Sequence, residues 1–127
     1  TKALTSHLRD GSESLQRLVL TSLGTVADAE TIQAVAAVAT THKSWAIRAI
    51  AVETLGRFGQ HGHREVAPRL SSIAKNDPYA LVREAALSAL VGFDRPSAIA
   101  LARDLATSDA EPHVRLSASA ILNASKR

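Results

Sequence analysis

The chain has 127 residues, 46% of them hydrophobic, with six glycines, four prolines, no cysteine and only four aromatic residues. Abundant helix formers with few helix breakers favour an all-α class, and the absence of cysteine excludes a disulfide framework and thiolate chemistry. The formal charge of +3 comes from basic residues spread among acidic ones. Because nucleic-acid-binding modules usually show a concentrated basic stripe, nucleic acid is not favoured as a partner.

The predicted elements begin with a short helix over residues 1–8, which ends at the sequence Asp10-Gly11-Ser12. A longer helix follows over about residues 12–24 and carries Arg17 on the side opposite its apolar residues. We interpret these two elements as an incomplete first repeat.

One apolar pattern occurs four times along the chain. It starts at Leu15, Ile47, Val82 and Val114, which are spaced by 32, 35 and 32 residues. From each start, apolar or small residues fall at offsets of 3, 4, 7, 8 and 11 positions, with few exceptions, which is the stripe of a one-sided amphipathic helix. The pattern therefore predicts four equivalent helices.

Partner helices are predicted between them, over residues 28–40, 64–75 and 96–107. Pro68 lies about four positions into the second of these, so that helix either starts late or bends. Gly59 and Gly62 are interpreted as a helix stop and a turn.

Helix pairs joined by such short connections lie antiparallel, and pairs that recur every 32 to 35 residues stack into an array. We therefore expect a single domain over residues 1–127, built as a right-handed α-solenoid of about four helical hairpins. The expected repeats are about 1–26, 27–59, 60–93 and 94–125, the first one incomplete.

No apolar run approaches the length of about 18 residues that a membrane-spanning helix needs, so no membrane is expected as a partner. The sequence contains no methionine and begins inside a predicted helix, from which we expect it to be part of a larger protein. Its composition does not identify the cellular compartment, although the cytoplasm is favoured.

The segment that runs from Arg64 to Leu90 has a proline in the first helix, an aspartate in the turn at Asp77, and Val82-Arg83 at the start of the second helix. In these features it resembles a HEAT repeat of the short, phycobilin-lyase-like kind. The same six-residue spacing from aspartate to arginine returns at Asp109 and Arg115. The tetratricopeptide and ankyrin signatures fit the sequence less well.

The resemblance implies that these aspartates and arginines form a ladder inside the stack. An aspartate before a helix can accept amide hydrogen bonds, and an arginine one turn into the helix can pair with its own aspartate or with that of the neighbouring repeat. A row of ligand-binding arginines is the alternative. In the first two units, Gln16 and His42 stand where the pattern has arginine and aspartate. The expected ladder residues are Asp10, Arg48, Asp77, Arg83, Asp109 and Arg115.

Catalytic chemistry is not indicated. The sequence contains no nucleophile elbow, no ordered triad and no phosphate-binding glycine-rich loop. The cluster from His61 to Glu65 offers two imidazoles and a carboxylate but lacks a further ligand for a metal. We therefore expect no catalytic residue, no metal and no cofactor.

Candidate partner-binding residues are those that point away from the apolar stripes, together with the aromatic residues at two helix starts. They are Arg17, Trp45, Glu53, Tyr79, Glu84 and Leu116. Large aromatic residues near a polar rim often anchor interfaces, although Trp45 and Tyr79 could instead fill gaps between repeats. Leu116 and Ala120 leave the last helix apolar on its outer side, so we expect another repeat or domain to cover this end.

The sequence therefore predicts a non-catalytic protein–protein interaction or scaffolding module, an accessory domain of a larger protein or enzyme. Its expected partner is another protein or an adjacent domain of the parent chain. One alternative is an accessory protein similar to the chromophore lyases, which would need a cleft the size of a tetrapyrrole. The other is a HEAT-like domain that binds nucleic acid, whose affinity would fall steeply with salt.

Overall fold

The structure is a computed structural model that describes residues 29–125, and this part of the chain is helical throughout, with no strand. None of its helices is long and apolar enough to cross a membrane. The predicted first repeat, with Asp10 and Arg17, lies outside the described residues. The elements are α3 (Ala29–Thr41), α4 (Trp45–Gln60), the 3-10 helix η1 (Arg64–Val66), α5 (Ala67–Asn76), α6 (Ala80–Phe93), α7 (Arg95–Ser108) and α8 (Pro112–Ser125).

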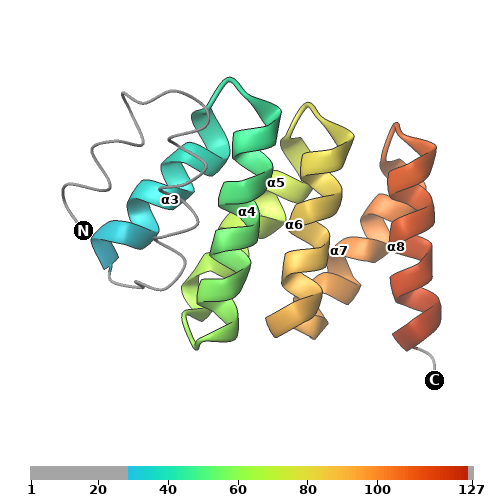
Figure 1. Cartoon of the computed structure of the whole chain (residues 1–127). Coiled ribbons are helices and arrows are strands. Elements are labelled where there is room, and N and C mark those ends of the chain that lie inside the picture. The colour runs from blue at the N-terminus through green and yellow to red at the C-terminus, as the bar shows by residue number, and fades with distance from the viewer. Residues whose placement is uncertain (1–28, 126–127) are drawn as a thin grey trace.

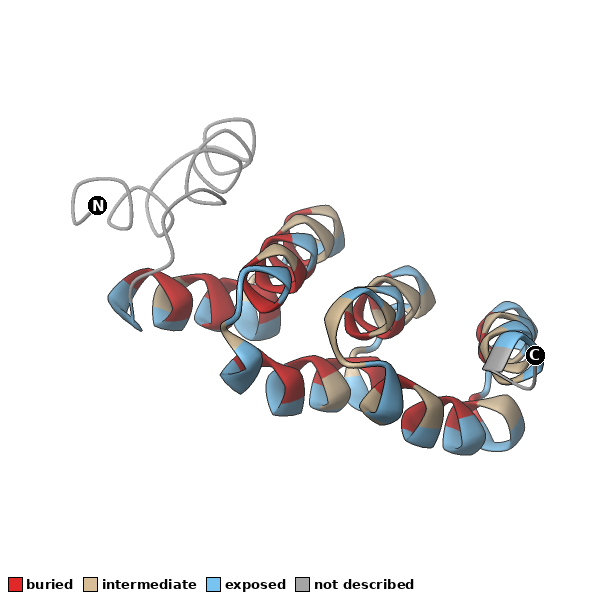
Figure 2. Cartoon of the chain, turned by 90° about the horizontal axis from the view of Figure 1, so that it is seen from below, coloured by how far each residue is buried: buried red, intermediate tan, exposed pale blue. Residues whose placement is uncertain are grey.

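The helices form three successive hairpins, α3 with α4, α5 with α6, and α7 with α8, placed side by side along the molecule (Figure 1). Figure 2 shows two layers: the first helices of the hairpins occupy one and the second helices the other. Each second helix packs on its own first helix, and α4 also packs extensively on α6. This arrangement confirms the predicted all-α solenoid of helical hairpins.

The core lies between the two layers. The residues that open the apolar pattern, Ile47, Val82 and Val114, are all fully buried. Val52 and Leu87 are also buried, although they fall five positions after Ile47 and Val82 and outside the predicted stripe. The reason is that α4 and α6 have neighbours on more than one side, so a wider arc of each helix is covered.

The helix starts follow the local chemistry of the sequence. Pro68 is the second residue of α5, because the preceding residues form the separate turn η1, so of the two predictions the late start is the correct one. Asp94 caps α7: its carboxylate accepts hydrogen bonds from the amide of Ser97 at 3.3 Å and from the hydroxyl of Ser97 at 2.8 Å.

The prediction that Gly59 stops a helix is wrong, because α4 continues to Gln60. Gly59 is instead a contact point, since a Cβ at this position would lie 2.5 Å from Cδ1 of the Phe93 ring on α6. Gly56 serves the same purpose, because its added Cβ would lie 2.9 Å from the Cβ of Ala89. The turn after α4 is made by Gly62, which has φ of 102°.

We predict that Leu90→Ala lowers the free energy of unfolding by about 2 to 5 kcal/mol, because Leu90 is fully buried and its removal leaves a cavity. Leu81 lies on the same helix but is exposed, so Leu81→Ala should change stability by no more than about 0.5 kcal/mol. Urea denaturation followed by circular dichroism measures both. Equal midpoints for the two variants would contradict the packing described here.

Candidate interaction site

Arginines of α4 and α6 bind aspartates of the following hairpin. Nε and Nη2 of Arg48 donate to the two carboxylate oxygens of Asp77 at 2.9 and 3.2 Å. Nε and Nη2 of Arg83 donate in the same way to Asp109, both at 2.9 Å. Of the two pairings considered from the sequence, the structure therefore contains the one between neighbouring repeats.

The third guanidinium nitrogen of each arginine binds its own loop. Nη1 of Arg48 donates to the carbonyl of His42 at 2.7 Å, and Nη1 of Arg83 donates to the carbonyl of Asp77 at 2.8 Å. Each arginine thus joins the loop inside its own hairpin to the equivalent loop of the next hairpin.

The aspartates are fixed by their own loops as well. Oδ1 of Asp77 accepts the amide of Tyr79, and Oδ1 of Asp109 accepts the amide of Glu111, both at 2.9 Å. His42 stands at the equivalent position in the α3–α4 loop, and its Nδ1 accepts the amide of Ser44 at 3.0 Å. The imidazole of His42 therefore makes the turn contact that the aspartate makes in the other two loops. The spacing of the sequence alone did not reveal this role.

The Arg83–Asp109 pair is well shielded from water, with side-chain exposures of 12% and 4%. Burial alone would raise the pKa of Asp109, but the hydrogen bond from Arg83, the Glu111 amide and the nearby Arg115 charge hold it below its ordinary value of 3.8. A carboxyl whose folded-state pKa is lowered stabilises the fold above its unfolded pKa. This contribution is therefore present at neutral pH and is lost only as the pH falls below about 4.

Trp45 and Tyr79 lie together at the starts of α4 and α6. Their rings are stacked, with centroids 6.0 Å apart and an angle of 13° between the planes. The guanidinium carbon of Arg48 lies 5.6 Å from the centre of the Tyr79 ring. The two residues remain 39% and 50% exposed, and Leu81, two residues after Tyr79 in the sequence, is exposed too. We call Trp45, Tyr79 and Leu81 the aromatic edge.

Glu84 is engaged within the molecule. Its Oε1 contacts Nδ1 of His113 and accepts the hydroxyl of Ser117 at 3.3 Å, both on α8. The hydrogen bond to Glu84 and its negative charge, with a smaller contribution from Glu111, raise the pKa of His113 above its ordinary value of 6.5. Glu84 therefore joins two hairpins, whereas Glu53 on α4 is exposed and Leu116 on α8 is 69% exposed.

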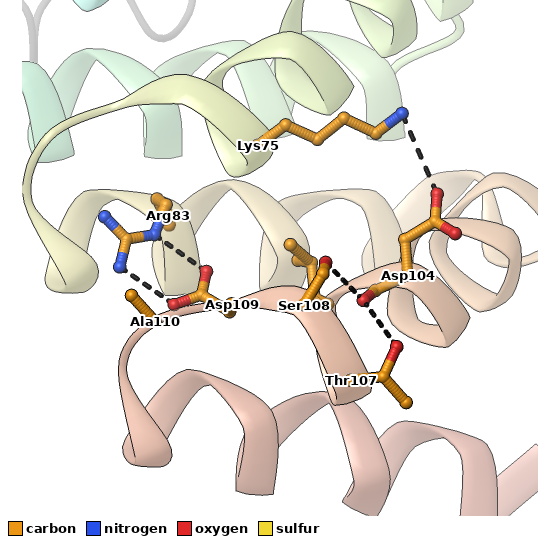
Figure 3. A pocket seen from close by; sticks show the side chains of 8 residues that line it. Lys75, Arg83, Asp104, Thr107, Ser108, Asp109 and Ala110 are labelled. Atoms are coloured by element: carbon orange, nitrogen blue, oxygen red, sulfur yellow. Dashed lines mark hydrogen bonds and ion pairs between the residues drawn. The ribbon is translucent and has the colours of Figure 1, made fainter.

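An open hollow of about 490 Å³ lies between α5, α6 and α7 (Figure 3). Its cations have acidic partners: Arg83 binds Asp109, and Nζ of Lys75 lies 3.9 Å from Asp104. Between Ala29 and Ser125, no group of three or more histidine or acidic side chains could hold a metal ion. In the cluster from His61 to Glu65, Nδ1 of His63 lies 3.4 Å from the carboxylate of Glu65.

We predict that Arg83→Ala chiefly lowers stability, by about 3 to 5 kcal/mol, because it leaves the buried carboxylate of Asp109 without its two strongest donors. Arg69→Ala is the control, since Arg69 is exposed and makes one hydrogen bond, to Gln33 at 3.0 Å, and it should cost no more than about 0.5 kcal/mol. Thermal melting followed by circular dichroism compares them. Unchanged melting of Arg83→Ala with loss of a bound partner would instead assign Arg83 to ligand binding.

We predict that the His113–Glu84 contact contributes stability that depends on pH. Because the folded-state pKa of His113 is raised, this contribution is present below the ordinary value of 6.5 and is lost as the pH rises through the raised value. His113→Gln should therefore lower the melting temperature more at about pH 5.5 than at about pH 8.5. His61→Gln, in the turn after α4, is the control. An equal effect of His113→Gln at both pH values would count against the contact.

A family model for HEAT repeats matches residues 1–91, which is more than half of the chain. No curated protein and no solved structure matches the sequence significantly. The matched region includes the loop of Asp77 and the start of α6 with Arg83, and the unmatched hairpin of α7 and α8 repeats the contact between arginine and loop carbonyl at Arg115 and Asp109. The chain belongs to the HEAT-repeat family.

Proposed function

We propose that the chain is a non-catalytic protein-interaction or scaffolding module that binds a protein partner through the aromatic edge. HEAT repeats generally mediate protein–protein interaction or scaffolding. The observation that carries the proposal is the exposed Trp45–Tyr79 stack, together with the exposed Leu81 two residues after Tyr79. Exposed apolar side chains that are grouped together, rather than scattered singly, are typical of interaction sites.

The geometry of the aromatic edge suits an anchor. Tryptophan and tyrosine dominate the binding energy of many interfaces because they bury a large rigid surface on contact. The stack and the neighbouring guanidinium of Arg48 hold Tyr79 in place before any partner arrives. Because Arg48 is itself fixed by Asp77, the edge is organised by the ladder, and less ordering entropy is lost on binding.

The acidic candidates predicted from the sequence have different surroundings in the fold. Glu84 is occupied by His113 and Ser117, so we do not count on it for partner contacts. Glu53 is exposed on α4 and remains a candidate for the polar rim of the interface. Leu116 lies on α8, outside the aromatic edge, and is 69% exposed.

We predict that Trp45→Ala and Tyr79→Ala each weaken partner binding by at least about 10-fold to 30-fold, the usual effect of removing an aromatic anchor. The immobilised chain is first used to capture proteins from the extract of its native cells, and the affinity of the captured protein is then measured by calorimetry. Arg103→Ala is the matched control, because Arg103 is exposed on α7, in the other layer.

The variants must melt like the unchanged chain for the comparison to count as a binding effect. Capture that survives both aromatic substitutions would show that the aromatic edge is not the binding surface. Capture that disappears after nuclease treatment, with steep weakening by salt, would favour nucleic acid instead.

A further inference from the structure

Arg115 on α8 makes the same loop contact as the two ladder arginines before it. Its Nη1 donates to the carbonyl of Asp109 at 2.7 Å, as Arg83 does to Asp77 at 2.8 Å. The loop contact therefore holds all three arginines in the same way, and the remaining Nε and Nη2 nitrogens should point in equivalent directions.

What differs is the second contact. In Arg48 and Arg83, Nε and Nη2 bind both oxygens of an aspartate in the following hairpin. Within residues 29–125, the hydrogen-bonding partner of the Arg115 side chain is the Asp109 carbonyl alone. A planar fork of donors that matches a carboxylate is thus available on α8.

The residues around this fork are more exposed to solvent than the residues at the equivalent positions of α4 and α6. Leu55 and Leu90 are fully buried, whereas Leu122, at the same position in α8, is only half-buried. Leu116 stands at the position that Glu84 has in α6. The side chain of Glu84 contacts α8, the second helix of the next hairpin, whereas Leu116 is 69% exposed. The exposed side of α8 therefore corresponds to the side of α6 that the last hairpin covers.

We propose that this side of α8 is the docking surface for a further helical hairpin, and that Arg115 binds a carboxylate through Nε and Nη2. The carboxylate belongs to an aspartate that precedes the second helix of that hairpin, as Asp77 and Asp109 precede α6 and α8. This surface is distinct from the aromatic edge and does not depend on the function proposed for it.

The chemistry of the surface bears on how such a hairpin would be held. Ser119 on α8 stands at the position of the buried Val52 and Leu87 and is half-buried. The contact is thus less apolar than those inside the array, and the ion pair at Arg115 carries a larger share of its specificity.

A copy of the last hairpin of the chain can serve as the probe. A second copy of residues 94–125, inserted directly after Ser125, places the copied Asp109 as far after Arg115 as Asp109 lies after Arg83 in the sequence. The extended chain should stay monomeric, gain the helix content of one hairpin and melt in a single transition at a higher temperature, because a docked repeat stabilises its neighbour. An appended hairpin that stays unfolded or melts separately at a lower temperature would overturn the proposal.

A double-mutant cycle then tests the ion pair. In the extended chain, Arg115→Gln and Asp109→Asn in the copy should each lower the melting temperature by at least about 3 °C, and the double variant should fall little further. In the original chain, Arg115→Gln should have a smaller effect, since only the carbonyl contact is lost. Additive losses in the cycle would contradict the pairing.

A second readout does not rely on stability. The Nε proton of Arg115, observed by NMR, should shift downfield and exchange more slowly with water in the extended chain than in the original one. Asp109→Asn in the copy should reverse both changes. An Nε signal that is the same in the original and the extended chain would overturn the proposal, as would a concentration-dependent dimer of the original chain formed through α8.

Discussion

Neighbouring hairpins in this protein are joined at their loops by arginine–aspartate pairs that are almost completely shielded from water. Removing both charges from water is costly, and further hydrogen bonds to the loops help to offset that cost. Arg48 and Arg83 each have one nitrogen on a carbonyl of their own loop and two on the next aspartate. The stack of apolar faces supplies most of the stabilisation, and the ladder specifies which loops meet.

The periodicity of the sequence was sufficient to predict the helices and most of the core. Apolar residues at a fixed set of offsets from Ile47, Val82 and Val114 predict equivalent helices that each have one buried face, and the three starting residues are fully buried. The stripe did not include Val52 and Leu87, because it describes burial against one neighbour, whereas α4 and α6 are packed from several directions. Gly59 was misread for a related reason: its role depends on Phe93, which is distant in the sequence.

The candidate site was less accessible to prediction. The sequence placed Asp77 and Asp109 before helices and arginines within them, but left open which carboxylate each arginine binds, since that depends on the offset between hairpins. It offered two roles for Trp45 and Tyr79, interface anchor or gap filler. In the structure the two rings belong to different hairpins, stack on each other and remain exposed to solvent. The arrangement is therefore compatible with both roles. The place of Glu84 on its helix predicts an available side chain, and only the position of His113 reveals that it is bound.

The glycines of α4 make the two joints between hairpins, one between α4 and α6 and the other between α6 and α8, unequal. Gly56 and Gly59 let α4 and α6 approach so closely that no additional atom fits between them, whereas Val91 stands on α6 where α4 has Gly56. The contact between α6 and α8 is correspondingly smaller. Within residues 29–125, bending between α6 and α8 therefore disrupts fewer contacts than bending between α4 and α6. A bound partner that reached across α6 would change the curvature of this part of the array more easily at the joint between α6 and α8.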